Sequence, residues 1–473
     1  MLAYGIEPNG KVIALFCNDG RTLDTDNWDD ATSFLLQPTT DFSVVYNLDK
    51  FVDGLTDLLD ADLKDKILNG GRILINNRMI YYQPTKVFGI NHINFYGLKK
   101  YSDTEPDDEN KLLELGNKVV NAYKKLGVSE ITKLTSPIAV FGEKLSNIPY
   151  ARVCDLPDNS LPLVDACAKT MTREWRDTFK LGNWNKDEIT DYDLSAAYPS
   201  IVAELPDITN ATFFSSETMP QTYSWGEMQG ELIITKPLSP FYHEQTDSYP
   251  VGNLGEQSIT TDELWLLSKY QIGTFKFRHG DFFTLPNKIF YPFKDTMLNL
   301  YKARSNDDEL VSKIAKGISV GIWGKFAERY EERLGDNFNS IYARMTTSRC
   351  IVKVASFIYH NQMENDIVSI LVDGLLSTKR LQNVSIEKKM GQWRMNEFNP
   401  ALVLSTLYQW IGDKKPAMLT YGNMTNLISE KPNNHIYGDV DLNLITHSRK
   451  FKTLPRTGKE LLENKYSSDP IKA

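Results

Sequence analysis

Two aspartates far apart in the chain occupy positions where acidic side chains can do chemistry. Asp193 ends a short strand-like run, 189–194, which is followed by a turn and by the start of a helix. Asp373 follows the apolar run 367–372 and precedes Gly374, and an Asp-Gly pair between two apolar runs indicates a β-hairpin. Hard cations such as Mg²⁺ prefer carboxylate oxygens and leave room for substrate phosphates. The residue types therefore suit a divalent-metal site; the simpler alternative is that Asp193 only caps the following helix.

The composition is that of a globular protein with more than one domain. The chain has 473 residues, of which 41% are hydrophobic and 24% charged, and its net charge is −8. We expect no membrane association and a cytoplasmic location, in the host cytoplasm if a virus or plasmid encodes the chain, because no apolar run could cross a bilayer and the start lacks a signal peptide. Four scattered cysteines argue against a zinc site or a disulfide framework. The mild acidity lowers the expectation of nucleic-acid binding without excluding it.

The elements predicted for the first 150 residues are of mixed α and β type. A strand is expected at 12–17 and a hairpin over 72–82. One helix is expected where an apolar stripe runs from Phe51 to Ile67, and a second over 112–126. This pattern predicts an α/β domain before the residues that could do chemistry.

Further along, helical signals prevail between the two aspartates. Thr260 and Glu263 form a capping-box pattern that opens a helix. Two helices joined by a polar turn at 305–308 are expected next. A helical stretch follows over 340–360, in which Arg344 and Arg349 are expected to face outward.

The stretch from Asp193 resembles motif A of family B DNA polymerases, whose pattern is Asp-x-x-Ser-Leu-Tyr-Pro. Here it reads Asp193-x-x-Ala196-Ala197-Tyr198-Pro199. Motif C of the same family, Asp-Thr-Asp-Ser, corresponds to Leu371-Val372-Asp373-Gly374, so that Leu371 replaces the first aspartate. The resemblance implies that Asp193 and Asp373 are the catalytic residues and bind two Mg²⁺ ions, for which Mn²⁺ can substitute, and that Leu194 is also a metal ligand. Asp191, on the Asp193 strand face, is a candidate for the missing charge.

Motif B of the family, Lys-x-x-x-Asn-Ser-x-Tyr-Gly, resembles residues 316–324. Val320, Gly321 and Trp323 stand in place of Asn, Ser and Tyr. The resemblance implies a nucleotide-binding site formed by five residues: Tyr198, Lys302, Arg304, Lys316 and Gly321. Tyr198 would lie beneath the incoming sugar and select deoxynucleotides, and the glycines would leave a helix face bare for the nascent base pair. The alternative is a glycine-rich helix packed against a neighbour.

The first domain resembles the proofreading exonuclease domain of the family, with its motifs eroded. Gly5-Ile6-Glu7 stands for Asp-x-Glu, and Phe51 stands where an aspartate should follow Asn47. The third motif, Tyr-x-x-x-Asp, is best placed at Glu114-x-x-x-Lys118, where a lysine would repel a metal ion. We therefore expect an exonuclease-type fold without exonuclease activity.

The end of the chain resembles the DNA-binding thumb of the family. Tyr408 matches the tyrosine of a Lys-x-Tyr motif whose lysine is Thr406. A basic segment over 446–459 contains Lys450, Lys452 and Arg456, which would track duplex phosphates. A solvated face is the equally weighted alternative.

The resemblance, closest to the phage and plasmid type and similar to the protein-primed branch, implies a multidomain α/β and α+β fold: an RNase H-like exonuclease-type domain, then a right-hand polymerase domain with palm, fingers and thumb. The expected boundaries are as follows: degenerate exonuclease-like domain 1–150, bridge 151–188, palm with motif A 189–290, fingers with motif B 291–345, palm with motif C 346–395 and thumb 396–473.

The implied function is template-directed DNA synthesis, in which deoxynucleotides are added to a 3′-hydroxyl by two-metal phosphoryl transfer without 3′–5′ proofreading. The implied partners are DNA template and primer, deoxynucleoside triphosphates, and a terminal protein or other priming factor. Two alternatives stay open. One is a catalytically weak or inactive polymerase-like scaffold that binds nucleic acid in replication or defence, and the other is an enzyme that starts chains without a primer.

Overall fold

The structure is a computed structural model, and the chain divides into two compact units. The first comprises residues 1–148 and 298–322, the second 149–297 and 323–473. The residues described are 1–9, 12–37, 42–70, 72–221, 224–330, 333–396, 400–403, 409–411, 450–451, 463–469 and 472. Within these ranges no helix has the length and apolar character needed to cross a membrane.

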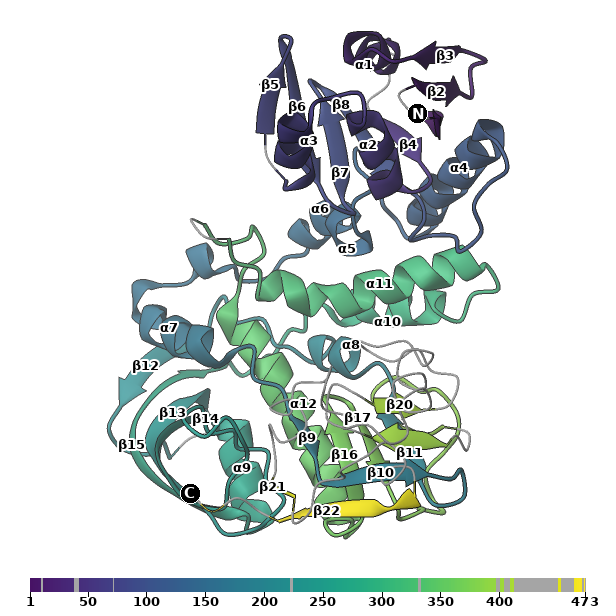
Figure 1. Cartoon of the computed structure of the whole chain (residues 1–473). Coiled ribbons are helices and arrows are strands. Elements are labelled where there is room, and N and C mark those ends of the chain that lie inside the picture. Colours follow the sequence, from purple (N-terminus) through teal and green to yellow (C-terminus); the bar gives the residue numbers. More distant parts are fainter. Residues whose placement is uncertain are drawn as a thin grey trace. The chain divides into compact units, whose positions relative to one another are not determined.

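An eight-stranded sheet forms the centre of the first unit, in the order β3-β2-β1-β4-β8-β7-β6-β5 (Figure 1). β1 (Leu2–Asn9), β4 (Phe42–Val45) and β8 (Ile93–Gly97) are parallel neighbours. All other pairs in the sheet are antiparallel, and they involve β2 (Val12–Cys17), β3 (Thr22–Thr25), β5 (Arg72–Ile75), β6 (Arg78–Gln83) and β7 (Val87–Ile90). The strand predicted at 12–17 and the hairpin predicted over 72–82 are confirmed. Asn76 and Asn77 have φ values of 47° and 61°, as a two-residue type I′ turn requires.

Within the described part of residues 1–148, six helices accompany this sheet: α1 (Trp28–Leu36), α2 (Leu48–Thr56), α3 (Ala61–Leu68), α4 (Glu109–Lys125), α5 (Pro137–Val140) and α6 (Gly142–Ser146). The single helix expected between Phe51 and Ile67 is wrong, because the structure has two helices there. The Asp60 carboxylate accepts a hydrogen bond from the amide of Leu63 at 2.9 Å and so starts α3 as a new helix. α4 confirms the helix predicted over 112–126.

A five-stranded sheet carries both motif aspartates in the second unit, in the order β18-β11-β17-β16-β9. Its strands are β9 (Arg176–Thr178), β11 (Thr190–Leu194), β16 (Ile367–Leu371), β17 (Gly374–Ser377) and β18 (Trp393–Met395). α12 (Ser340–His360) packs on one face, where Tyr192 and Leu375 share a buried cluster with Val354 of the helix. Burial of this face positions the sheet on the helix, because a one-residue shift would turn its apolar side chains to the opposite face.

Two further sheets and four short helical segments also belong to the described part of the second unit (Figure 1). One sheet has the order β12-β15-β13-β14 and consists of β12 (Thr212–Ser216), β13 (Trp225–Ile234), β14 (Gly252–Thr260) and β15 (Gly273–Thr284). The other has the order β20-β19-β10-β22-β21 and consists of β10 (Lys180–Trp184), β19 (Ala401–Val403), β20 (Gln409–Ile411), β21 (Lys450–Phe451) and β22 (Lys465–Asp469). The helical segments are η1 (Val153–Asp155), η2 (Asp158–Ser160), α7 (Leu161–Thr170) and α8 (Ala197–Val202).

The capping box predicted at Thr260 is confirmed at the start of α9 (Thr261–Lys269). The Thr260 hydroxyl accepts a hydrogen bond from the Glu263 amide at 3.1 Å, and the Glu263 carboxylate accepts one from the Thr260 amide at 2.8 Å.

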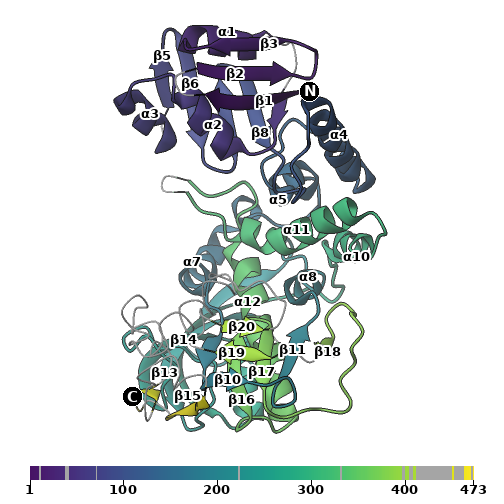
Figure 2. The ribbon, with the colours of Figure 1, turned by 45° about the vertical axis from the view of Figure 1, so that its right-hand side comes forward.

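The predicted helical pair is also confirmed as α10 (Lys294–Ala303) and α11 (Glu309–Phe326), which lie side by side in both views (Figures 1 and 2). Asp308 accepts a hydrogen bond from the Val311 amide at the start of α11. The Ser312 hydroxyl donates to the carbonyl of Arg304, the residue that follows α10, at 2.6 Å. The boundary between the two units falls within each of these helices.

Candidate active site

The strands that carry Asp193 and Asp373 are hydrogen-bonded neighbours. β11 and β17 run antiparallel with Asp193 opposite Gly374, and the amide of Leu194 donates to the carbonyl of Asp373 at 2.9 Å. Two segments 180 positions apart in the sequence therefore meet at one end of the sheet. Cross-strand neighbours at this spacing have side chains close enough to interact.

The hairpin that presents Asp373 differs by one residue from the predicted one. Leu371 pairs with Gly374, so the two turn residues are Val372 and Asp373, and Gly374 begins β17. Val372 has a φ of 59°, which is strained for a β-branched residue and costs about 1–3 kcal/mol. The turn is held in place because the Val372 amide donates to the carbonyl of Trp175 at 2.9 Å, next to β9.

Arg394 forms an ion pair with Asp193 in which two guanidinium nitrogens contact one carboxylate oxygen. Its Nε and Nη2 atoms lie 2.9 Å and 2.8 Å from Asp193 Oδ2, and the two residues are register partners on β18 and β11. Both side chains are partly exposed, at 20% for Arg394 and 29% for Asp193. Because both side chains are partly exposed, the carboxylate can exchange its arginine for a metal ion. The sequence motifs contain no signal for this arginine.

Asp191, the candidate for the missing charge, is buried and held by another residue. Its Oδ2 accepts a hydrogen bond from Asn396 Nδ2 at 2.7 Å, and its carbonyl accepts one from the Asn396 amide. Asn396 lies just beyond β18, so that the segment 393–396 contacts both aspartates of β11.

Tyr198 lies in the first turn of α8, directly after the turn that follows Asp193. Ala196 adopts a left-handed conformation with φ of 51° and lets the chain turn from β11 into the helix. The Tyr198 ring lies 5.3 Å from the ring of Trp323, the motif B residue, at an interplanar angle of 43°. The hydroxyl of Tyr198 donates to Glu174 Oε1 at 2.8 Å. Burial raises the pKa of Tyr198, and the nearby Cys350 and Glu174 add to this shift.

Glu174 and Arg176 were not identified in the sequence. Arg176 Nη2 lies 2.6 Å from Glu174 Oε2, and Arg176 is the register partner of Leu371 on β16. Their segment precedes β11 and carries no spacing that marks it as functional. Only the pairing of β9 with β16 brings it to the end of the sheet where Asp373 lies.

The predicted nucleotide-binding residues of α10 and α11 belong to the first unit, and Asp193 and Asp373 belong to the second. Lys302 and Lys316 are exposed, and the guanidinium of Arg304 lies 5.7 Å from the centre of the Tyr301 ring. The bare helix face is partly covered: a side-chain carbon at Gly321 would meet Ile138 of α5 at 2.7 Å, and one at Gly317 would meet Pro137 at 2.9 Å. At these two glycines the structure agrees with the alternative interpretation, a glycine-rich helix packed against a neighbour.

The prediction that Arg344 faces outward is wrong. Its side chain is fully buried and forms ion pairs with Glu227 at 3.1 Å and Glu263 at 2.6 Å. A buried guanidinium requires such partners because an unpaired charge is strongly disfavoured there. Arg349, on the same helix, is partly exposed and pairs with Asp262 at 3.4 Å.

Most of the predicted thumb contacts fall outside the described residues. This holds for Tyr408, Lys452 and Arg456, and Lys450 lies in β21, opposite Asp469.

The residues of the first two eroded exonuclease motifs line a groove of about 220 Å³ in the first unit, and those of the third do not. Glu7 is exposed there, and the Asn47 side chain accepts a hydrogen bond from the Lys50 amide and so caps α2. The carboxylate of Glu109, at the start of α4, occupies the space into which a side chain at Gly5 would extend. Lys118 forms an exposed ion pair with Glu114 at 2.8 Å, one turn apart on α4.

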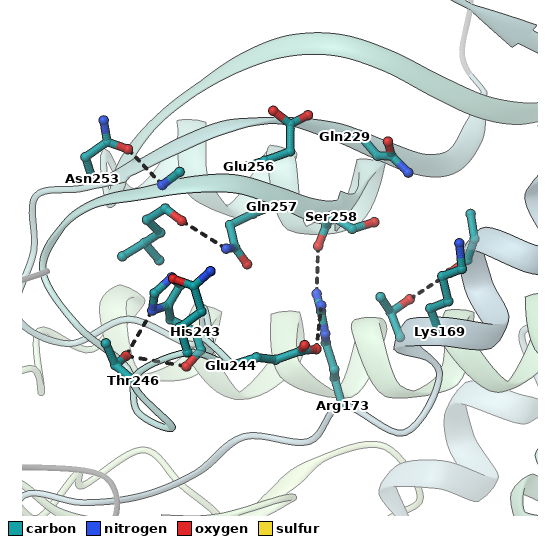
Figure 3. Close-up of a pocket in the computed structure, with 15 residues that line it drawn as sticks. Lys169, Arg173, Gln229, His243, Glu244, Thr246, Asn253, Glu256, Gln257 and Ser258 are labelled. Carbon is teal, nitrogen blue, oxygen red and sulfur yellow. Dashed lines mark hydrogen bonds and ion pairs between the residues drawn. The ribbon is translucent and has the colours of Figure 1, made fainter.

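A larger cavity of about 810 Å³ lies away from the motif aspartates, between α7, β13, β14 and the loop 243–246 (Figure 3). Its lining contains charges of both signs, Lys169 and Arg173 together with Glu244 and Glu256. Arg173 already donates to the Ser258 carbonyl at 2.8 Å and lies 3.5 Å from Glu244. We assign this cavity no chemistry.

The donor atoms at the end of the β11–β17 pair fit a Mg²⁺ ion that binds together with a substrate. Such ions are held by one or two carboxylates together with the phosphates of a nucleotide. Asp193 and Asp373 supply two carboxylates, and the backbone at Leu194 lies beside them. In the described part of the chain no three His, Cys, Asp or Glu side chains are grouped to hold a metal without such help.

Comparison with known proteins identifies solved structures that share the fold of this chain. No family model matches the sequence, and no curated protein matches it. Among solved structures, phi29 DNA polymerase in complex with primer-template DNA and incoming nucleotides matches with a TM-score of 0.56 and 12% identity, over 85% of this chain and 85% of that chain. The chain shares the fold of phi29 DNA polymerase. The complex of that polymerase with single-stranded DNA matches with a TM-score of 0.54 and 12% identity over 86% of each chain. At this identity the likeness concerns the fold alone.

Proposed function

We propose that this chain is a template-directed DNA polymerase that adds deoxynucleotides to a 3′-hydroxyl. The observation that carries the proposal is the pairing of β11 with β17, which brings Asp193 and Asp373 to the same end of one sheet. Bound at these carboxylates and at Leu194, two Mg²⁺ ions would activate the 3′-hydroxyl and stabilise the leaving pyrophosphate. The shared fold with phi29 DNA polymerase supports this assignment.

The chain's own residues divide the work between metal binding and nucleotide binding. Asp193 and Asp373 hold negative charge where the ions would bind, and Arg394 neutralises Asp193 until then. Tyr198 forms the floor beneath the sugar, where a ring excludes a 2′-hydroxyl, and Lys316, Lys302 and Arg304 supply positive charge for the triphosphate. The base sequence is copied by base pairing, so the protein itself contacts mainly phosphates and shape.

The first unit would be a proofreading domain that has lost its chemistry. Its sheet order, in which β1, β4 and β8 are parallel and β2 and β3 are added antiparallel, supports an exonuclease-type fold. Gly5 and Lys118 stand where anionic ligands belong. The domain would guide template or single strand. The thumb, with Tyr408, Lys450, Lys452 and Arg456, would bind duplex, and a terminal protein or other factor would supply the primer.

The second candidate is a polymerase-like protein that binds nucleic acid without synthesis. Two observations favour it: two nitrogens of Arg394 contact Asp193 Oδ2, and Leu371 stands where motif C has its first carboxylate. This candidate predicts DNA binding with no incorporation under any metal condition.

The deciding experiment is extension of a labelled primer on a DNA template with Mg²⁺ and deoxynucleotides. The parent protein is expected to extend, and Asp193→Asn and Asp373→Asn to lower the rate at least about a thousandfold, which corresponds to ~4 kcal/mol of transition-state stabilisation. Glu188→Gln changes an exposed acidic residue just before β11 that pairs with Lys465, and it serves as the matched control with parent activity.

The outcomes separate the candidates. Equal extension by parent and Asp373→Asn would exclude the assigned site. A parent that shifts primed DNA in a gel without extending it would favour the non-catalytic scaffold. Product formed without a primer would identify an enzyme that starts its own chains.

A further inference from the structure

We infer that Glu174 positions Tyr198 and thereby determines how strictly this chain selects deoxynucleotides over ribonucleotides. The inference rests on the proposed function and adds a residue to it. Glu174 lies outside every motif that pointed to the site, on the segment that leads into β9.

The backbone around Glu174 is fixed by three hydrogen bonds. The Tyr249 hydroxyl donates to the Glu174 carbonyl at 3.0 Å and accepts from the Arg176 amide at 3.2 Å. The carbonyl of the intervening Trp175 accepts from the Val372 amide at 2.9 Å, and the Trp175 side chain is fully buried. The carboxylate of Glu174 is therefore presented from a rigid frame that also holds the Asp373 turn.

The carboxylate uses its two oxygens for two different partners. Oε1 accepts the hydrogen bond from the Tyr198 hydroxyl at 2.8 Å, and Oε2 lies 2.6 Å from Arg176 Nη2. The Glu174 side chain is only 19% exposed, so water competes little for the bond to Tyr198. A hydrogen bond to an ionised acceptor is about twice as strong as a neutral one.

The Tyr198 ring is thus held at its tip and on its face. Glu174 holds the hydroxyl, while Trp323 lies 5.3 Å from the ring and is itself fixed by donation from Nε1 to the Ala343 carbonyl at 3.2 Å. A ring fixed in one rotamer forms a wall of defined height beneath the sugar. Without the bond to Glu174 the ring can change its χ1 or χ2 angle and admit a 2′-hydroxyl.

The test is the ratio of kcat/KM for dATP to that for ATP on a primed template, in five variants, of which two are controls. Glu174→Ala is expected to lower this ratio about tenfold, the effect of losing one charge-assisted hydrogen bond. Tyr198→Phe should lower it equally, and the double variant should lower it no further, because both changes remove the same bond.

Two variants serve as matched controls. Glu174→Gln keeps an oxygen that accepts from Tyr198 and is expected to restore most of the ratio. Arg176→Gln removes only the partner of Oε2 and should leave the ratio unchanged. A purely structural role for Glu174 would lower the rates with dATP and ATP together and leave their ratio constant.

Failure of the inference is distinct from failure of the proposed function. If the parent extends primers and Glu174→Ala keeps the parental ratio, only the inference is overturned. If the parent does not extend primers, the selectivity is measured instead as the ratio of the affinities for dATP and ATP. These affinities come from equilibrium binding to the protein on primed template with Ca²⁺, which requires no chemistry. A parent that binds neither nucleotide overturns both.

Discussion

At the scale of single residues, the contact that bears most on the proposed activity is the ion pair between Arg394 and Asp193. Both side chains are partly exposed, and an ion pair of this kind contributes roughly 1 kcal/mol. A divalent cation that binds Oδ2 of Asp193 must displace the guanidinium, because both nitrogen contacts are to that oxygen.

We therefore expect Arg394→Gln to bind Mn²⁺ about fivefold more tightly, since roughly 1 kcal/mol of competition is removed. Titration with Mn²⁺ of the protein bound to a dideoxy-terminated primer-template and a nucleotide, followed by the signal of unbound Mn²⁺, measures this change. Arg176→Gln removes an arginine that pairs with Glu174 instead of Asp193 and provides the control. Weaker binding in Arg394→Gln would mean that the arginine orients the carboxylate.

A second residue-scale effect concerns Lys100 in the first unit. Its ammonium donates to the carbonyls of Leu134, at 2.6 Å, and Thr135, and burial lowers its pKa to about 8. In the unfolded chain the pKa of a lysine is about 10.4. Between these values the unfolded chain binds more protons, so this lysine makes the free energy of unfolding rise with pH from about 8 upward.

Lys100→Met should remove that rise. Buried thiols and tyrosines with raised pKa values, such as Cys17 and Tyr4, act in the opposite direction over the same range, so the parent and variant must be compared at each pH. Between pH 8 and 9.5 we expect the free energy of unfolding of the parent to rise by about 1.5 kcal/mol relative to that of Lys100→Met, as measured by urea denaturation. A constant difference would show that Lys100 does not titrate there.

At the scale of elements, the glycines of α11 have different surroundings although they follow one another by about one turn. A side-chain carbon at Gly321 would meet Ile138 at 2.7 Å, whereas one at Gly324 would meet nothing within 4 Å. The first glycine allows α5 to approach α11, and the second is available for substitution.

Gly324→Ala is expected to raise the free energy of unfolding by about 1 kcal/mol, because alanine costs less than glycine inside a helix. Gly321→Ala should lower it by about 1–3 kcal/mol through the forced shift of Ile138. Thermal unfolding of the two variants beside the parent gives both signs in one experiment. A gain in stability at Gly321 would contradict the close packing of α5 on α11.

At the scale of the whole molecule, a buried ion cluster joins elements that are distant in the sequence. Arg344 on α12 binds Glu227 on β13 and Glu263 on α9 within the second unit. Thr170 of α7 and Ser258 of β14 donate to the other oxygen of Glu227, at 3.1 Å and 2.8 Å. One cluster therefore ties three helices to one sheet.

Arg344→Met should lower the free energy of unfolding by about 3–5 kcal/mol, because it leaves two carboxylates buried without their cation. Arg349→Met, on the same helix but with a partly exposed ion pair, should cost no more than about 1 kcal/mol. Urea denaturation compares the two. Similar losses for both would mean that the cluster contributes no more than a surface pair.

The predicted elements agree with the structure where they depend on interactions between residues close together in the sequence. The hairpin at Asn76 and Asn77, the capping box at Thr260 and the helical pair around 305–308 depend on neighbours a few positions away, and all three were predictable. The break between α2 and α3 was missed because the apolar stripe continues through it, although Asp60 is a capping residue that could have marked it. The exonuclease-like and thumb residues stay predictions.

The sequence alone determined the local elements and the residue types of motifs A, B and C, because turns, caps and periodic apolar stripes depend on nearby residues. Only the tertiary structure brought β11 beside β17, added Glu174 and Arg394 to the site, covered Gly321 with α5 and buried Arg344. Each of these depends on side chains from distant segments that meet when apolar faces are buried. The partners of a charge in such a place are chosen by packing, which no short sequence pattern records.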